Sequence, residues 1–161
     1  MSTKLTSGRA TAGFFASGKP GFGTGGVPFT SASTAVNLTS LKFPTGAIVT
    51  DFAVKITSVA ATSGNISVGI TTGASSGGVG NAYVSVLPIG AVGSYTLNAS
   101  TSAAVLAFNY GSYFIASSSA AVTVLKKHVV GSTDTYRYLN YTIDTTAAIA
   151  GVIYPFYFEL T

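Results

Sequence analysis

Few side chains in this sequence could take part in catalysis. His128 is the only histidine and cysteine is absent, so there is no thiol nucleophile and no zinc cluster. Ser-His-Asp catalysis would need His128 beside a carboxylate and an activated serine. No serine stands in a Gly-x-Ser-x-Gly elbow that turns a strand into a helix. We therefore expect His128, which follows Lys126 and Lys127, to be an exposed strand or loop residue.

Acidic side chains are equally sparse. The sequence contains four of them: Asp51, Asp134, Asp144 and Glu159. A glycosidase needs two carboxylates that face each other across a cleft, whereas Asp134 and Asp144 have the surroundings of turn residues. The same two residues lack the spacing of a calcium-binding loop. The sequence thus predicts no catalytic residue, no cofactor site and no metal site, in a protein that is not an enzyme.

Two further patterns could bind a ligand. The glycine-rich run 21–26 resembles a phosphate-binding loop, but such a loop lies between a strand and a helix, and Pro28 argues against a helix here. Tyr136 and Tyr138 share one face of a predicted strand, where aromatic rings stack on sugars or nucleobases or anchor protein interfaces. We predict a ligand or interface surface at these two tyrosines and favour packing or interface contact. Asn-x-Ser/Thr tripeptides carry little weight in a chain so rich in serine and threonine; they begin at Asn37, Asn65, Asn98 and Asn140.

Alternation of apolar and polar residues, the pattern of a half-buried strand, dominates the chain from residue 35 onward. In one predicted strand the apolar face consists of Ile48, Thr50, Phe52, Val54 and Ile56. The last predicted strand places on one face Val152, Tyr154, Phe156, Phe158 and Leu160. Eight to ten such strands without a convincing helix predict an all-β fold, an antiparallel β-sandwich over residues 35–161. A jelly roll fits best; the immunoglobulin-type alternative would have a buried tryptophan and a disulfide, which this chain lacks.

Residues 1–34 differ from this domain and are predicted to form an extended arm. Seven glycines, together with Pro20 and Pro28, are incompatible with a regular helix. A purely flexible linker would not contain four phenylalanines. We predict that the arm forms an interface through Lys4, Arg9, Phe14, Phe15, Lys19, Phe22 and Phe29. Two interpretations are equally open: these aromatic rings enter pockets on a neighbouring molecule, or they close one end of their own domain.

Charge is scarce and unevenly distributed. Charged residues make up 7% of the chain, against roughly 25% in an average soluble domain. No apolar run is long enough for a membrane helix or a signal peptide, so we expect cytoplasmic synthesis and a surface covered by partners. Lys4, Arg9 and Lys19 precede every acidic residue, but their density is low for a nucleic-acid-binding arm. An acidic protein surface is the partner that suits them better.

One stretch of the sequence carries a resemblance. Residues 41–57, Leu-Lys-Phe-Pro-Thr-Gly-Ala-Ile-Val-Thr-Asp-Phe-Ala-Val-Lys-Ile-Thr, and 65–70, Asn-Ile-Ser-Val-Gly-Ile, resemble structural proteins of tailed bacteriophages. The group is that of head decoration (cement) and minor capsid proteins, and the shared pattern is a turn that opens a strand. The resemblance implies a β-sandwich bound to the shell of the major capsid protein, often as a trimer, with a terminal arm that reaches its neighbours. It carries over no individual functional residue.

Three hypotheses about function result. The first is a virion structural protein, made in the host cytoplasm, that self-associates and cements or decorates an icosahedral capsid. The second is a carbohydrate-binding β-sandwich, such as a receptor-binding or fibre component, which would use Tyr136 and Tyr138. The third is a small hydrolase, which only His128 supports. Saturable glycan binding that is lost in Tyr→Ala variants would distinguish the second hypothesis from the first.

Overall fold

The computed structural model describes residues 26–31, 35–59, 64–72, 78–97, 109–118, 123–131, 137–144 and 148–159. These residues form eleven strands. The strands are β1 (Val27–Ser31), β2 (Asn37–Lys42), β3 (Ala47–Val59), β4 (Asn65–Thr71), β5 (Val79–Pro88), β6 (Gly93–Thr96), β7 (Ile115–Ser118), β8 (Thr123–Leu125), β9 (His128–Val129), β10 (Tyr138–Ile143) and β11 (Ile149–Glu159). No helix in this described part of the chain is long and apolar enough to cross a membrane.

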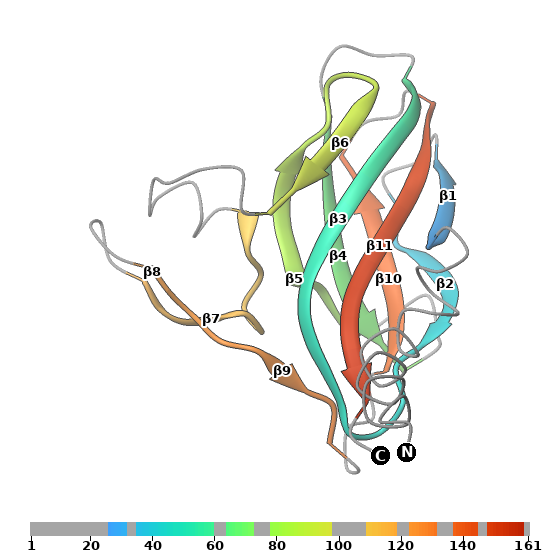
Figure 1. Cartoon of the computed structure of the whole chain (residues 1–161). Coiled ribbons are helices and arrows are strands. Elements are labelled where there is room, and N and C mark those ends of the chain that lie inside the picture. Colours follow the sequence, from blue (N-terminus) through green and yellow to red (C-terminus); the bar gives the residue numbers. More distant parts are fainter. Residues whose placement is uncertain are drawn as a thin grey trace, which may run out of the picture.

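Two antiparallel sheets lie face to face and form a sandwich (Figure 1). The first, sheet A, has the strand order β1-β11-β3-β6, and β9 pairs with another part of β3. The second, sheet B, has the order β2-β10-β4-β5, while β7 and β8 form a separate two-stranded sheet. The predicted all-β antiparallel sandwich is therefore confirmed. The finer assignment as a jelly roll stays a prediction.

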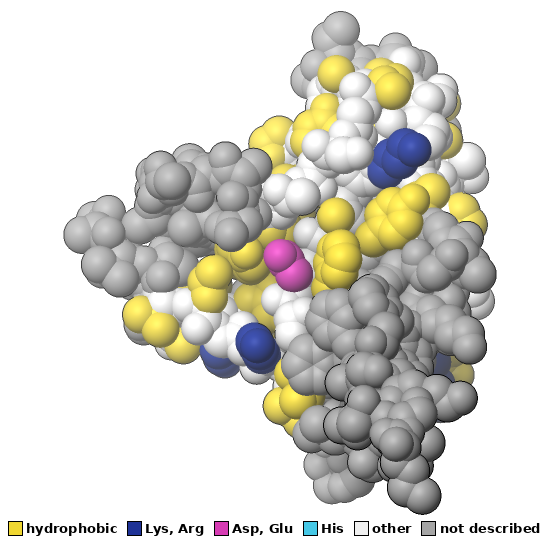
Figure 2. All heavy atoms as spheres, viewed as in Figure 1, with side chains coloured by type: hydrophobic (Ala, Val, Ile, Leu, Met, Phe, Trp, Pro, Cys, Tyr) yellow, Lys and Arg dark blue, Asp and Glu magenta, His cyan; other side chains and the backbone are white. Residues whose placement is uncertain are grey.

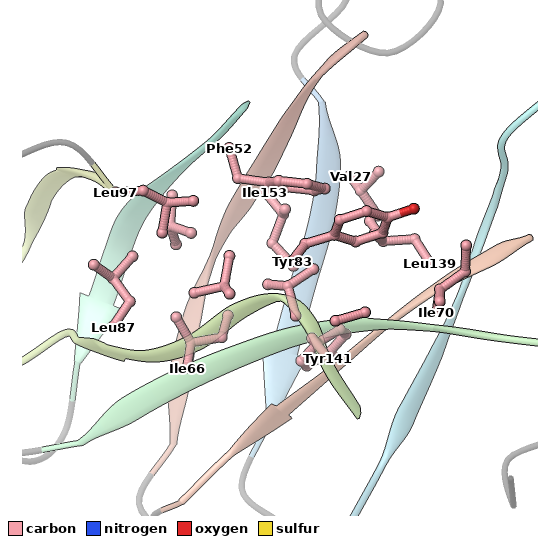
Figure 3. Close-up of a cluster of buried hydrophobic side chains, with 14 of the residues drawn as sticks. Val27, Phe52, Ile66, Ile70, Tyr83, Leu87, Leu97, Leu139, Tyr141 and Ile153 are labelled. Carbon is pink, nitrogen blue, oxygen red and sulfur yellow. The ribbon is translucent and has the colours of Figure 1, made fainter. Parts of the chain in front are cut away.

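Side chains from both sheets fill the space between them (Figure 3). Phe52 and Ile153 of sheet A and Ile66 and Leu139 of sheet B are all buried. Tyr83 of β5 lies among them and stacks on Phe52, with ring centroids 5.0 Å apart. Burial of one large apolar side chain stabilises the fold by about 1.5–3 kcal/mol, so this shared core holds the two sheets together.

The inward face of β3 changes part-way along the strand. The second half agrees with the prediction, because the buried residues there include Phe52, Val54 and Ile56. The first half does not, because Ala47 and Val49 are buried whereas Ile48 and Thr50 are only partly buried. A strand that kept a strict period of two could not bury both sets. The strand must therefore contain an extra residue between them.

Two irregularities in the pairing of β3 with β11 account for this change. The register shifts between Phe156 and Tyr157 and again between Ala150 and Gly151. Thr50 donates its hydroxyl hydrogen to the carbonyl oxygen of Phe156 at 2.9 Å, and Thr57 donates to that of Ala150 at 3.1 Å. A bulge leaves a residue without a ladder partner. At both bulges a threonine hydroxyl supplies a hydrogen bond to the opposite strand.

In β11, the row of side chains that the sequence marks as apolar faces outward, and the other row faces the core. The inward row of this strand consists of Ile149, Gly151, Ile153, Pro155 and Tyr157, all buried. The predicted apolar row faces outward instead: Val152 and Tyr154 are partly buried, and Phe156 is 37% exposed. Sheet A consequently presents apolar side chains on its outer surface as well as to the core.

The predicted arm ends earlier than residue 34. Residues 27–31 form β1, which pairs antiparallel with β11 at the edge of sheet A. Phe29 is 4% exposed and its ring centroid lies 5.3 Å from that of Tyr141. Of the two interpretations of the arm's aromatic rings, Phe29 agrees with packing in its own domain and not with an interface: Val27 and Phe29 alternate with Pro28 and Thr30, so the segment fits a half-buried strand. The remaining predicted arm residues lie outside the described residues: Lys4, Arg9, Phe14, Phe15, Lys19 and Phe22.

Candidate interaction surfaces

His128 has a packing role in the structure. It lies in β9, half-buried, and its Nδ1 is 2.8 Å from the hydroxyl oxygen of the fully buried Tyr83. Its ring centroid is 4.6 Å from that of Tyr113. A buried tyrosine hydroxyl requires a hydrogen-bond partner, and His128 supplies one while β9 pairs with β3. Sequence patterns could not indicate this contact, because the two residues are 45 positions apart.

The described acidic groups do not form a metal site. Within the described ranges no group of three or more His, Cys, Asp or Glu side chains could hold a metal ion. Asp144 follows β10 and accepts a hydrogen bond from the backbone nitrogen of Asn65 at 2.6 Å, which joins the ends of two neighbouring strands. This agrees with its prediction as a turn residue. Asp134 lies outside the described residues.

Of the predicted tyrosine pair, only Tyr138 lies within the described residues. It is half-buried in β10, opposite Lys42 of β2, and the Lys42 ammonium nitrogen is 5.2 Å from its ring centroid. A lysine over an aromatic ring is attracted by the electron density of the ring face. The Lys42 ammonium group therefore lies over one face of the Tyr138 ring, and the prediction of a ligand surface at Tyr138 stays a prediction. Nearby Asn140, which begins an Asn-x-Thr tripeptide, is only 1% exposed and so cannot accept a glycan in the folded protein.

The outer face of sheet A carries three residues of the apolar row that the sequence predicts for the last strand. We define this outer face by three residues of β11, Val152, Tyr154 and Phe156, and by three residues of β3, Asp51, Ala53 and Lys55. The register places them in pairs: Phe156 beside Asp51, Tyr154 beside Ala53 and Val152 beside Lys55. In the view of Figure 2, hydrophobic side chains lie between an acidic and a basic side chain on the front of the molecule.

Asp51 lies where the free edge of β3 has no strand partner among the described residues. β6 pairs with residues 53–56 of β3 and β9 pairs with residues 48–49, which leaves residues 50–52 between them. Burial raises the pKa of the Asp51 carboxyl, and the hydrogen bond that its Oδ1 accepts from the Phe52 nitrogen at 2.7 Å acts against this rise. Burial and the negative charge of Asp51 together raise the pKa of the Tyr110 hydroxyl to about 12. Burial therefore disfavours the charged form of Asp51. Within the part of the chain that the structure describes, no ion pair offsets this effect.

A groove separates the edge strands β1 and β2 at one side of the sandwich. Its volume is about 370 Å³, and it is lined by Val27, Pro28, Phe29, Thr30, Leu38, Thr39, Ser40 and Tyr141. The Tyr141 hydroxyl donates a hydrogen bond across it to the carbonyl oxygen of Thr30 at 3.3 Å. Each of the two strands is paired on one side only among the described residues. The exposed apolar side chains of the β2 segment are Val36, 37% exposed, and Leu38, 42% exposed.

Comparisons of this chain with protein-family models, with curated proteins and with solved structures found no match. The geometry of the described surfaces is therefore what any assignment of function must rest on.

Proposed function

We propose that this chain is a virion structural protein that self-associates and cements or decorates an icosahedral capsid. The observation that carries the proposal is the groove between β1 and β2, with a strand edge on each side that has no strand partner among the described residues. Proteins that remain monomeric usually protect such edges with charged side chains, proline or covering segments. β1 contains such a residue, Pro28, whereas on the edge strand β2 the apolar Leu38 is exposed, so the β2 edge favours association.

An extended segment of a neighbouring copy is the occupant that suits this groove. A strand added at a sheet edge gains backbone hydrogen bonds, and its alternate side chains enter pockets beside the edge. Residues 1–25 combine glycines with Phe14, Phe15 and Phe22, and they join the sandwich at Gly26, next to β1. The groove volume of about 370 Å³ falls within the range of about 300–1,000 Å³ that is typical of binding clefts.

The scarcity of charge supports a repeated arrangement of copies. Charged residues make up 7% of the chain, and a surface with so little charge does not keep copies apart by repulsion. Weak contacts become durable when a symmetric array repeats them. Lys4, Arg9 and Lys19 would then meet acidic patches of the shell, since they precede every acidic residue of the chain.

Self-association through the groove can be tested with one substitution and a matched control. We expect the full chain to form oligomers in light scattering coupled to size-exclusion chromatography. Leu38→Glu should shift the population toward smaller species, because it places a charge in an apolar contact, and a chain of residues 26–161 should do the same while remaining folded. Val92→Glu is the control, since Val92 is 62% exposed and does not line the groove.

The capsid part of the proposal needs a separate measurement. Particles purified on a density gradient from cells that make the chain should contain it in a fixed ratio to the shell protein, as mass spectrometry would determine. Absence of the chain from such particles would refute the virion assignment. A monomeric full chain, or oligomers that Leu38→Glu leaves unchanged, would refute the role of the groove.

A further inference from the structure

We infer that the outer face of sheet A is a two-fold contact between two copies of this chain. The groove and the outer face are formed by different residues, so this inference adds a second kind of contact to the proposed self-association. It rests on three features of the described residues. These are the two apolar rows of β11, the positions of one acid and one base, and the register of β3 with β11.

β11 is apolar on both of its faces. In a sandwich with one face in water, strands alternate apolar and polar side chains, whereas strands buried on both faces are apolar throughout. β11 lies in the middle of sheet A between β1 and β3. Its outward side chains are nevertheless Val152, Tyr154 and Phe156, which is 37% exposed. β11 thus has the composition of a strand with protein on both sides.

The charges identify a second copy as the cover. Asp51 and Lys55 point outward from β3 at equal distances in sequence from Ala53. A two-fold axis that runs across the strands at Ala53 and Tyr154 would place Asp51 of each copy over Lys55 of the other. An isologous contact has this property, because residue i meets residue j and residue j meets residue i. The single patch therefore complements itself in charge.

The apolar residues obey the same symmetry. Phe156 lies beside Asp51 and Val152 lies beside Lys55, so the same axis would put the large Phe156 ring over the small Val152 side chain. Tyr154 would meet Tyr154 of the second copy at the axis, where tyrosine side chains often anchor interfaces. Sheets that pack face to face are about 10 Å apart. A lysine side chain is long enough to reach a carboxylate across that distance.

The inferred contact differs from the trimer that the phage resemblance implies. A closed trimer joins two different patches of each copy, whereas a self-complementary patch produces pairs. The burial of the Asp51 carboxyl fits the pairing as well. A basic partner from a second copy would offset the cost of holding this charge away from water.

Cross-linking provides a direct test in the full-length protein. The chain contains no cysteine, so Ala53→Cys introduces the only thiol, close to the inferred axis. Because facing sheets are about 10 Å apart, a short bis-maleimide should link two such thiols and give a covalent dimer on a denaturing gel. Thr72→Cys is the matched control: Thr72 is exposed, directly follows β4 and so lies at the end of a strand of the opposite sheet, sheet B.

Charge reversal tests the partner residues. Lys55→Asp should weaken pairing at least about tenfold, because each contact would then juxtapose two acids. Asp51→Lys should weaken it similarly, and an equimolar mixture of the two variants should restore dimers, since each mixed contact regains opposite charges. Lys55→Arg keeps the charge and should pair like the wild type. If Asp51→Lys fails to fold by circular dichroism, the comparison of Lys55→Asp with Lys55→Arg is sufficient.

Several outcomes would overturn the inference. One is cross-linking of Ala53→Cys no stronger than that of Thr72→Cys, and another is a Lys55→Asp chain that pairs as well as the wild type. A third is cross-linking only after residues 1–25 are removed, which would show that the chain's own N-terminal segment covers the face. Leu38→Glu distinguishes the two contacts, because it should abolish association through the groove and leave the Ala53→Cys dimer intact.

Discussion

At the scale of single residues, Tyr83 shows how much of this molecule depends on contacts between distant positions. Its ring packs against Phe43, Phe52 and Phe114, with centroids 5.8, 5.0 and 5.3 Å away. Its hydroxyl is paired with His128. A buried aromatic side chain contributes both apolar area and ring contacts to stability. This one residue connects β5, β3 and β9, and through it the lone histidine of the chain packs against the core.

Tyr110 gives a prediction about alkaline pH. Burial and Asp51 raise its pKa to about 12, from an ordinary value of 10.0. The folded protein holds this proton more tightly than the unfolded chain, so its contribution to stability is complete below pH 10 and is lost as the pH rises toward 12. Tyr110→Phe has no proton to lose. Measured by urea denaturation, the variant should gain about 1 kcal/mol in free energy of unfolding relative to the wild type between pH 7 and about 11.5, after allowance for solvent screening.

An identical pH dependence in the wild type and in Tyr110→Phe would contradict this prediction. The sequence could not have identified Tyr110, because nothing in its neighbours marks it as buried beside an acid 59 positions earlier. The same holds for Asp51, which sequence reasoning treated only as one of four scattered acids. Positions of single groups within a site depend on which strands meet, and periodicity does not determine this.

At the scale of strands, close backbone approach constrains particular glycines. Gly69 of β4 lies where a Cβ would collide with the carbonyl oxygen of Val79 and with the backbone of Gly80. The backbone there has little room to yield, because β4 pairs with β5 on both sides of Gly69, at Val68 and at Ile70. Gly69→Ala should therefore lower the free energy of unfolding by about 1–3 kcal/mol, as an overpacked site does.

Gly80 provides the matched control, since it belongs to the partner strand and a Cβ there would meet nothing within 4 Å. Gly80→Ala should change stability by no more than about 1 kcal/mol, because it adds no clash and restricts the unfolded chain. Both variants can be compared by thermal unfolding followed by circular dichroism. Equal destabilisation by the two substitutions would refute the steric argument.

The strands also show where hydropathy patterns succeed and where they fail. The pattern located β3 and the residues Phe52, Val54 and Ile56 on its inward face. It failed at Ile48, because the bulge at Thr50 shifts the alternation by one residue, and a bulge leaves no sequence signal as simple as a period. It also failed for β11, where both rows of side chains are apolar. Hydropathy alone cannot decide which of two apolar rows faces the core.

At the scale of the whole molecule, the sequence was sufficient for the fold class. Short alternating segments separated by turns, without a helical period, predict an antiparallel sandwich, and the two sheets confirm it. The end of the arm was misplaced, because Val27-Pro-Phe-Thr30 follows a glycine-rich run and contains a proline, which is permitted in an edge strand. Local sequence patterns cannot predict which distant strands pair, such as β1 with β11.

Association should make the thermal stability of the molecule depend on its concentration. A contact that exists only between folded chains stabilises them by mass action. A hundredfold increase in concentration should therefore raise the Tm of the wild type by about 5 °C, as measured by scanning calorimetry. Lys55→Asp should show a smaller increase, because one of the two inferred contacts is weakened. A Tm that does not change with concentration would argue against both contacts.

The two sides of the sandwich close their edges differently. On one side, the backbone nitrogens of Gly111 and Tyr113 donate hydrogen bonds to the carbonyl oxygens of Tyr83 and Ala82, both at 2.8 Å, so the outer edge of β5 is occupied. On the other side, β1 and β2 have no further strand partner among the described residues. Within the described residues, sheet B can therefore accept a further strand beside β2, but not along the part of β5 that these two hydrogen bonds occupy.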